Sequence, residues 1–239
     1  MEQDDEKTVL VFGASGYIGT NLVEFLAARE RKVRATSRTL EILEGRGWYG
    51  VELCRADALE PESLDAALRG VDTAYYLVHS MAAGKSFPEL DAHAAQNFAE
   101  AAARQRVRRI VYLGGLTPND PRSAHLKSRE ETGDILRQGG VPVTELRAGM
   151  IIGPGSAAWE VIRDLVNHLP MMLTPRWVFS RSTPIALGNL LHYLAEVPKH
   201  EETAGEVYDV AGPDIVTLSL IHISEPTRHI CLSRMPSSA

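Results

Sequence analysis

The chain has 239 residues, of which 44% are hydrophobic, and its formal net charge is -6 at pH 7. That length suits one large domain, or one domain with a small appendage. The acidic balance leaves no basic footprint for nucleic acid, and no apolar run approaches a membrane span. Residues 1–7 are too charged for a signal peptide, and Cys54 and Cys231 are too few for a disulfide framework or a zinc site. We therefore expect a cytoplasmic protein that binds neither metal nor nucleic acid.

A glycine-rich stretch near the N-terminus organises the rest of the sequence. The apolar run at residues 8–12 is typical of a buried strand, and it leads into Gly13, Gly16 and Gly19 before an amphipathic helix. Such a turn directs backbone N–H groups and the positive end of the helix dipole at one point, which suits a pyrophosphate. Glycines can merely punctuate a loop, but this position between a strand and a helix favours a dinucleotide-binding site.

Two further strand ends carry polar residues suited to the adenosine half of a dinucleotide. The second predicted strand, residues 32–37, ends in Ser37 and Arg38 rather than in Asp or Glu. An acidic residue there prefers NAD, whereas an arginine pairs with the 2′-phosphate of NADP, so the sequence favours NADP unless Arg38 only caps a solvated loop. The third strand, residues 51–55, leads to Asp57, which either accepts a hydrogen bond from the adenine amino group or starts a loop.

The remaining periodicity continues the alternation of strands and helices. Strand 73–78 is followed by His79, at the edge where open α/β sheets bind ligands. This histidine is placed to contact the nicotinamide ribose or a substrate, or else it is an ordinary loop histidine, which we favour. We interpret the basic run at 104–109 as a solvated junction between a helix and a strand. Helices are expected at 61–68, 87–104 and 125–138, and strands at 109–113 and 142–146.

This alternation predicts an α/β fold, a Rossmann-type doubly wound parallel sheet, over residues 1–148. Residues 149–217 are expected to form a small, truncated C-terminal substrate lobe. Its predicted parts are a loop at 149–155, helices at 158–169 and 184–194, and a strand at 206–210. Within it, Pro175, Arg176 and Trp177 offer a cation and an aromatic face to an anionic or planar substrate, or they are a packing Trp beside a solvated Arg.

Residues 218–239 differ in character from the rest of the sequence. The run 218–228 can be back-translated to the DNA sequence of a transposase-derived sequencing adapter. The run 233–239 can likewise be back-translated to the outer part of the same adapter. Residues 229–232 lie where a sample barcode would. We therefore expect 218–239 to be non-native read-through, to be excluded from fold reasoning.

The motifs resemble the short-chain dehydrogenase/reductase superfamily, in particular its extended and atypical branch. The resemblance rests on the glycine motif 13–19, on Asp57, and on strand ends at 75–80 and 109–115, and it covers about residues 7–215. More narrowly, the chain is similar to bacterial NAD(P)H-binding proteins related to the NmrA-like regulators and to the 39 kDa accessory subunit of respiratory complex I. Four stretches carry this narrower resemblance: 75–81, 113–116, 141–147 and 174–178.

The motifs and the resemblance together imply NADP as the cofactor, with NAD as the alternative. The expected contacts come from the glycine turn and from the loops after the second, third and fourth strands. They are Gly13, Ser15, Gly16, Tyr17, Ile18, Gly19, Ser37, Arg38, Asp57, Ala58, Leu77, Val78 and His79.

The resemblance also implies where the chemistry would lie. In the superfamily, a Tyr-x-x-x-Lys pair on the helix after the fifth strand acts with a Ser at the end of that strand. Here His125 stands at the Tyr position, Arg129 at the Lys position, and Gly114 and Gly115 at the Ser position. His125 can act as a general acid near neutral pH, and Arg129 can hold the ribose without losing its proton. His125 and Arg129 are therefore the candidate catalytic residues of an atypical site.

Two functions follow from this predicted site. The first is an NADP(H)-dependent oxidoreductase or isomerase that acts on a small carbonyl or planar substrate. The second is a redox sensor or assembly factor that binds NADP(H) without turnover, and the replaced Tyr, Lys and Ser favour it. A nucleotide-sugar epimerase is a weaker alternative, because that chemistry also uses the Tyr. Helices on the outer faces of the sheet often pair in this superfamily, so a homodimer is one expectation.

Overall fold

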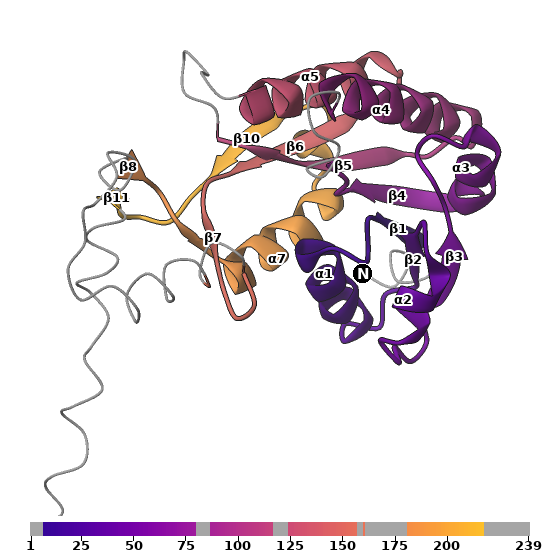
Figure 1. The fold of residues 1–239 in the computed structure, drawn as a ribbon, viewed down its shortest axis with the longest axis horizontal. Helices are drawn as coiled ribbons and strands as arrows, with labels where there is room; N and C mark the ends of the chain where they lie inside the picture. The colour runs from indigo at the N-terminus through magenta and orange to yellow at the C-terminus, as the bar shows by residue number, and fades with distance from the viewer. Residues whose placement is uncertain (1–6, 80–86, 117–123, 157–159, 161–180, 218–239) are drawn as a thin grey trace, which may run out of the picture.

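The computed structural model describes residues 7–79, 87–116, 124–156, 160 and 181–217. Within them, seven strands form one sheet in the order β10-β6-β5-β4-β1-β2-β3, and every neighbouring pair is parallel (Figure 1). The predicted Rossmann-type doubly wound α/β fold is confirmed. The strands are β1 Thr8–Phe12, β2 Val33–Ser37, β3 Glu52–Arg55, β4 Val71–Tyr76, β5 Arg109–Gly115, β6 Val143–Ala148 and β10 Val207–Val210.

The central strands face two hydrophobic cores, one on each side of the sheet. In β1, Leu10 and Phe12 belong to one core, and Val9 and Val11 belong to the other, as expected of a strand that is buried on both faces. Helices α3, α4 and α5 pack on the first core, and α1, α2 and α7 pack on the second (Figure 1). Their bounds are α1 Tyr17–Ala27, α2 Leu40–Glu44, α3 Pro61–Leu68, α4 Phe87–Arg104, α5 Ala124–Gln138 and α7 Leu187–Glu196.

Short elements complete the described part of the chain after β6. Two small two-stranded pairs are present, one parallel and one antiparallel, and two 3-10 turns connect α7 to β10. Residues 149–217 thus supply both a helix of the second layer and an edge strand of the main sheet, while the predicted division at residue 148 stays a prediction. These elements are β7 Ile151–Ile152 with β9 Ile185–Ala186, β8 Arg181–Ser182 with β11 Val216–Thr217, and the turns η3 Val197–Lys199 and η4 Glu201–Thr203.

Several predicted elements differ from the observed ones by a few residues at their ends, and three differences have a clear physical reason. Strand β4 ends at Tyr76 rather than at residue 78, because its neighbour β1 ends at Phe12 and turns into the glycine loop. Helix α2 was not predicted, since five residues are too few to show a helical period. The predicted loop 149–155 contains β7, whose two residues find their partner in β9.

Several sequence predictions lie outside the described residues. These are most of the helix at 158–169, the Pro175-Arg176-Trp177 group and the tail 218–239.

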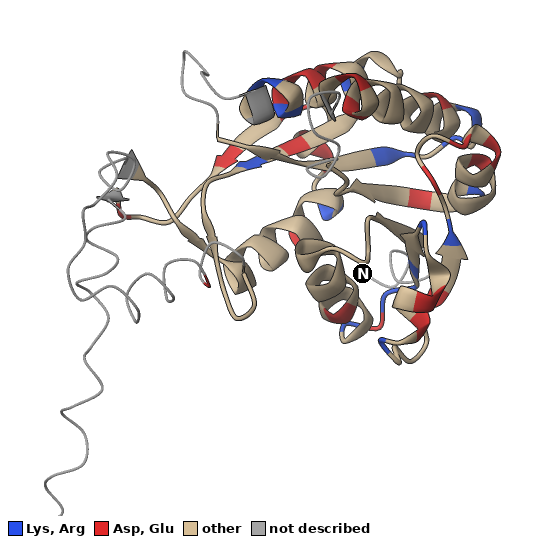
Figure 2. Ribbon diagram, in the orientation of Figure 1, with Lys and Arg blue, Asp and Glu red and all other residues tan. Residues whose placement is uncertain are grey.

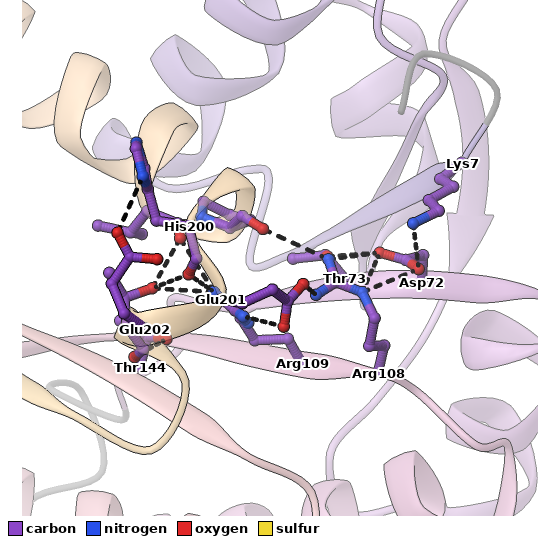
Figure 3. A network of polar contacts seen from close by, with 12 residues as sticks. Lys7, Asp72, Thr73, Arg108, Arg109, Thr144, His200, Glu201 and Glu202 are labelled. Atoms are coloured by element: carbon purple, nitrogen blue, oxygen red, sulfur yellow. Dashed lines mark hydrogen bonds and ion pairs between the residues drawn. The ribbon is translucent and has the colours of Figure 1, made fainter. Parts of the chain in front are cut away.

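The interpretation of residues 104–109 as a solvated junction is wrong for Arg109, which is 1% exposed. Its guanidinium donates hydrogen bonds to the carbonyl oxygens of Val197 and His200, at 3.0 and 2.8 Å, and to the Thr203 hydroxyl at 2.9 Å (Figure 3). It also pairs with the Glu201 carboxylate at 3.1 Å. The turns η3 and η4 therefore cover this side chain and dock on the N-terminal end of β5.

Charges of both signs are interspersed over the helices (Figure 2). Among the described residues, no helix is long and apolar enough to cross a membrane. The same residues hold no group of three or more His, Cys, Asp and Glu that could bind a metal ion.

Candidate functional site: a cleft at the C-terminal edge of the sheet

The turn between β1 and α1 depends on close backbone packing at two glycines. Gly13 has a φ of +95°, and a Cβ there would lie 3.0 Å from Cγ2 of Val78 and 3.2 Å from the Leu77 carbonyl. A Cβ on Gly19 would lie only 2.2 Å from the Gly13 carbonyl oxygen, so a side chain would push α1 away from β1. A Cβ on Gly16, in contrast, would meet only that same oxygen, at 3.4 Å. The space beside Gly16 is therefore open to a ligand.

Helix α1 begins at this opening without a side-chain cap. Gly16 is its N-cap residue and has no side chain to accept from the first-turn amides, which include those of Tyr17 and Ile18. The uncapped N–H groups and the helix dipole place partial positive charge beside Ser15 and Gly16, both of which line the cleft. This is the arrangement that binds a phosphate group.

A cleft of about 550 Å³ runs along the C-terminal ends of β1, β2, β3 and β4. It lies where the strand order reverses between β1 and β4, the position at which doubly wound sheets bind ligands. Its volume is that of a typical small-molecule site, roughly 300–1,000 Å³. The sequence-predicted residues that line it are Gly13, Ser15, Gly16, Ser37, Arg38, Asp57, Ala58, Leu77, Val78 and His79.

The end of β2 presents an uncompensated cation to this cleft. Arg38 is exposed, and among the described residues its side chain has no ion-pair or hydrogen-bond partner. The neighbouring Ser37 is buried, and its hydroxyl oxygen accepts a hydrogen bond from the Thr39 amide at 3.2 Å. The nearby Asp57 accepts one from the Leu59 amide at 3.0 Å. Asp57 thus shapes its loop, while its suggested contact with adenine stays a prediction.

His79 follows β4 and borders both this cleft and a second cavity. Its Nε2 lies 3.4 Å from the Leu113 carbonyl oxygen, which can only accept, so the proton belongs on Nε2 and Nδ1 keeps a lone pair. Within the described part of the chain, Nδ1 has no hydrogen-bond partner. Burial lowers the pKa of His79 to about 4, and the positive charge of Arg129 lowers the pKa further in the same direction. The imidazole is therefore neutral at pH 7.

The second cavity, of about 230 Å³, continues from the first past Gly16, Leu77 and His79. It brings the start of α1, with Tyr17, Ile18 and Gly19, together with Arg129 from α5. Arg129 is the predicted catalytic residue that the structure places in the site. His125 lies in α5 as well, but its side chain is not among those that the structure describes, so its role stays a prediction.

The space beside Gly114, one of the two glycines predicted to stand at the superfamily's Ser position, is filled by a buried carboxylate that sequence reasoning missed. A Cβ on Gly114 would lie 2.7 Å from Oε1 of Glu145, whose side chain is 2% exposed. The guanidinium of Arg147 pairs with Glu145 at 2.9 Å, and that of Arg137 pairs with its other oxygen. A larger residue at 114 would have to displace this ion-paired carboxylate. The one available signal was a charged residue inside the apolar strand 143–148.

The hydroxyl of Tyr112, near the cavity, is used in a structural hydrogen bond. The hydroxyl of Tyr112 donates a hydrogen bond to the backbone carbonyl of Arg129 at 2.8 Å. Burial and the negative charge of Glu145 raise the pKa of Tyr112, so its proton is held tightly at neutral pH. Tyr112 therefore positions the backbone of α5.

Two apolar residues at the mouth of the larger cleft were also missed. Ile42 on α2 and Leu59 after β3 are 48% and 44% exposed, and both line the cleft. Exposed aliphatic side chains beside Asp57 and Arg38 suit the face of a planar ring. Ile42 was overlooked because α2 itself was not predicted.

The sheet, the uncapped helix start and the cleft define a dinucleotide-binding protein of the Rossmann type. Comparison with known families identifies it further, since residues 5–152 match the NmrA-like family. The chain belongs to the NmrA-like family, and the resemblance that its motifs suggested is confirmed.

Known proteins agree with this assignment. The (4-alkanoyl-5-oxo-2,5-dihydrofuran-3-yl)methyl phosphate reductase of Streptomyces griseus is 28% identical over 218 residues, which cover 87% of this chain and 69% of the reductase. Three other curated relatives are matched over 34% to 55% of their own lengths.

Solved structures share the fold. A Citrobacter sp. triphenylmethane reductase complexed with NADP(H) superposes with a TM-score of 0.73 at 20% identity, over 90% of this chain and 73% of that one. A dTDP-glucose 4,6-dehydratase from Streptomyces venezuelae with NAD bound gives a TM-score of 0.76 at 18% identity, over 90% and 78%. At these identities the similarity concerns the fold alone.

Proposed function

We propose that the protein binds NADP(H) in the larger cleft and prefers it to NAD(H). The observation that carries the proposal is Arg38, an exposed guanidinium at the end of β2 that has no partner among the described residues. The 2′-phosphate of NADP(H) would neutralise this guanidinium and accept charge-assisted hydrogen bonds from it. The open side of Gly16 and the uncapped start of α1 suit the pyrophosphate, and Ile42 and Leu59 suit the adenine ring.

We further propose that the protein is a reductase for a small carbonyl or planar substrate. Bound NADPH supplies a hydride. The second cavity adjoins the cleft, and its lining includes the neutral His79, the charged Arg129 and Tyr17. Nδ1 of His79 offers an acceptor, and Arg129 offers a positive charge that does not titrate. The name of a related furanone phosphate reductase, 28% identical to this chain, supports reduction as the activity.

A non-catalytic NADP(H) sensor or assembly factor is the second candidate. It is favoured by Gly114, which leaves no hydroxyl where the superfamily has its Ser, and by Glu145, which occupies the space beside it. It is also favoured by His79, which holds no transferable proton on Nδ1 at neutral pH. A protein of this kind would bind NADP(H) in the cleft without transferring a hydride.

Two measurements on the same sample separate these functions. Titrations of NADPH and NADH, followed by the fluorescence of the reduced nicotinamide, should saturate, with the tighter binding for NADPH. Consumption of NADPH is then measured against a panel of aldehydes, ketones, quinones and furanones. Turnover of any of them supports the reductase, whereas tight binding without turnover supports the sensor. Without saturable binding of either nucleotide, both proposals fail.

A further inference from the structure

The second cavity contains a cation that nothing in the described protein neutralises. Arg129 is partly buried on α5, and its side chain has no hydrogen-bond or ion-pair partner among the described residues. A Cβ on Gly115 would lie only 3.2 Å from a terminal nitrogen of Arg129. The guanidinium therefore rests against the end of β5. A partly desolvated charge without a counter-charge is costly, and a bound anion would relieve that cost.

The described residues that line this cavity supply no competing carboxylate. Beside Arg129 and His79, the described lining residues are glycines, apolar residues and Tyr17. Glu145 is nearby in the fold, but it pairs with Arg137 and Arg147 and does not line the cavity. The positive charge of Arg129 is therefore directed at whatever enters the cavity.

Arg129 lines the second cavity from the β5 side, and the start of α1, where the pyrophosphate is expected, lines the same cavity. Phosphates would bind at the start of α1, which follows β1, whereas Arg129 rests against the end of β5. Strand β4 lies between β1 and β5. Because neighbouring strands are about 4.8 Å apart, the ends of β1 and β5 are roughly 10 Å apart. Arg129 thus enters the cavity from a different strand end than the one that precedes the pyrophosphate position, and a neutral ribose hydroxyl there would not compensate its charge.

We propose that the second cavity binds a small substrate through a carboxylate or phosphate group that pairs with Arg129. The planar fork of the guanidinium matches either oxyanion through two parallel hydrogen bonds. This inference rests on the proposed function, because it assigns a substrate class to the same cleft. The volume of about 230 Å³ restricts the ligand to a small acid or phosphate ester.

The test uses three probes of similar shape on protein saturated with NADPH, so that the phosphate position at α1 is already filled. Benzoate carries a carboxylate, phenyl phosphate carries a phosphate, and benzamide is the neutral analogue of benzoate. Binding is measured by titration calorimetry with wild-type protein, Arg129→Met and Arg129→Lys. Lys127→Met is the matched control, because Lys127 is an exposed cation on the same helix and does not line the cavity.

We expect benzoate or phenyl phosphate to bind wild-type protein more tightly than benzamide. The anion affinity should fall at least tenfold in Arg129→Met, fall less in Arg129→Lys, and stay within twofold in Lys127→Met. The anion that binds more tightly shows whether the site prefers a carboxylate or a phosphate. The inference is overturned if the anions bind no better than benzamide, or if Arg129→Met leaves their affinity unchanged.

The nucleotide titration on the same variants distinguishes failure of this inference from failure of the proposed function. If Arg129→Met loses NADPH affinity tenfold while anions have no effect, Arg129 serves the cofactor and the inference is wrong. If neither nucleotide binds wild-type protein, the proposed function fails, and the anion titration on the nucleotide-free protein still tests Arg129. Unchanged circular dichroism and unfolding temperature confirm that each variant is folded.

Discussion

Two sets of arginines differ in their partners and in their positions. Arg108, Arg109 and Arg137 are each paired with carboxylates and support the sheet and the helices around it. Arg38 and Arg129 line the two cavities and have no such partner among the described residues. Since an arginine without a counter-ion contributes little to folding, these two side chains are better explained by ligands than by stability.

Replacement of Arg38 tests nucleotide preference at a single residue. In Arg38→Met we expect the affinity for NADPH to fall by about 10- to 100-fold, which is the range of a charge-assisted hydrogen bond to phosphate. The affinity for NADH should change less than threefold, because NADH has no 2′-phosphate. Arg46→Met is the control, since Arg46 is exposed just after α2 and does not line the cleft. Equal losses for both nucleotides in fluorescence titrations would mean that Arg38 does not read the 2′-phosphate.

Residue patterns showed where the ligand-facing positions lie, but they could not show long-range neighbours. The glycine turn, Arg38 and His79 were found because each directly follows a predicted strand. Gly114 and Glu145 are far apart in the sequence, and only the pairing of β5 with β6 brings them together. No local signal couples a missing Ser at one position to a buried carboxylate at the other.

At the scale of elements, the connection from α7 to β10 is fixed mainly by one buried side chain. Arg109 donates to two carbonyl oxygens of η3 and the residue after it, and to the Thr203 hydroxyl. Arg108 extends the same network to Asp72 at 3.0 Å and Glu201 at 2.8 Å (Figure 3). The turns are too short to be stable alone, so their position depends on these hydrogen bonds.

Arg109→Met should therefore destabilise the fold more than loss of its charged partner does. We expect the free energy of unfolding to fall by about 2–4 kcal/mol, because acceptors that face a buried guanidinium lose their donor. Glu201→Gln should change it by less than about 1 kcal/mol, since that carboxylate is 78% exposed and well solvated. Urea unfolding followed by circular dichroism gives both values. A loss in Arg109→Met no larger than in Glu201→Gln would contradict the assigned role.

The predictability of the elements follows from their length and their burial pattern. Helices α3 and α4 and strand β1 have the predicted bounds, because the helices carry apolar residues at a helical period and β1 is a continuous apolar run. Strand β4 ends early for a tertiary reason, the end of its neighbour β1. The exposure of Arg109 was mispredicted for a similar reason, since the turns that cover it lie about ninety residues later in the chain.

At the scale of the whole molecule, the cleft is a consequence of strand order. Strands β2 and β3 extend the sheet on one side of β1, and β4, β5, β6 and β10 extend it on the other. The loops after β1 and β4 therefore diverge and leave a space that side chains do not fill. His79 lies at this divergence, between the two cavities, and is partly buried.

The burial of His79 links global stability to pH. Its pKa falls from an ordinary 6.5 to about 4 on folding, so between these values the unfolded chain binds a proton that the folded protein does not. The free energy of unfolding therefore decreases as the pH falls from about 6.5 to about 4, and this one residue accounts for on the order of 3 kcal/mol of the change. His79→Gln keeps an N–H donor for the Leu113 carbonyl and cannot take up a proton. Urea unfolding at several pH values from 4 to 7 should show a steeper loss of stability in wild-type protein than in His79→Gln. Parallel curves for the two proteins would mean that His79 is protonated in the folded state as readily as in the unfolded one.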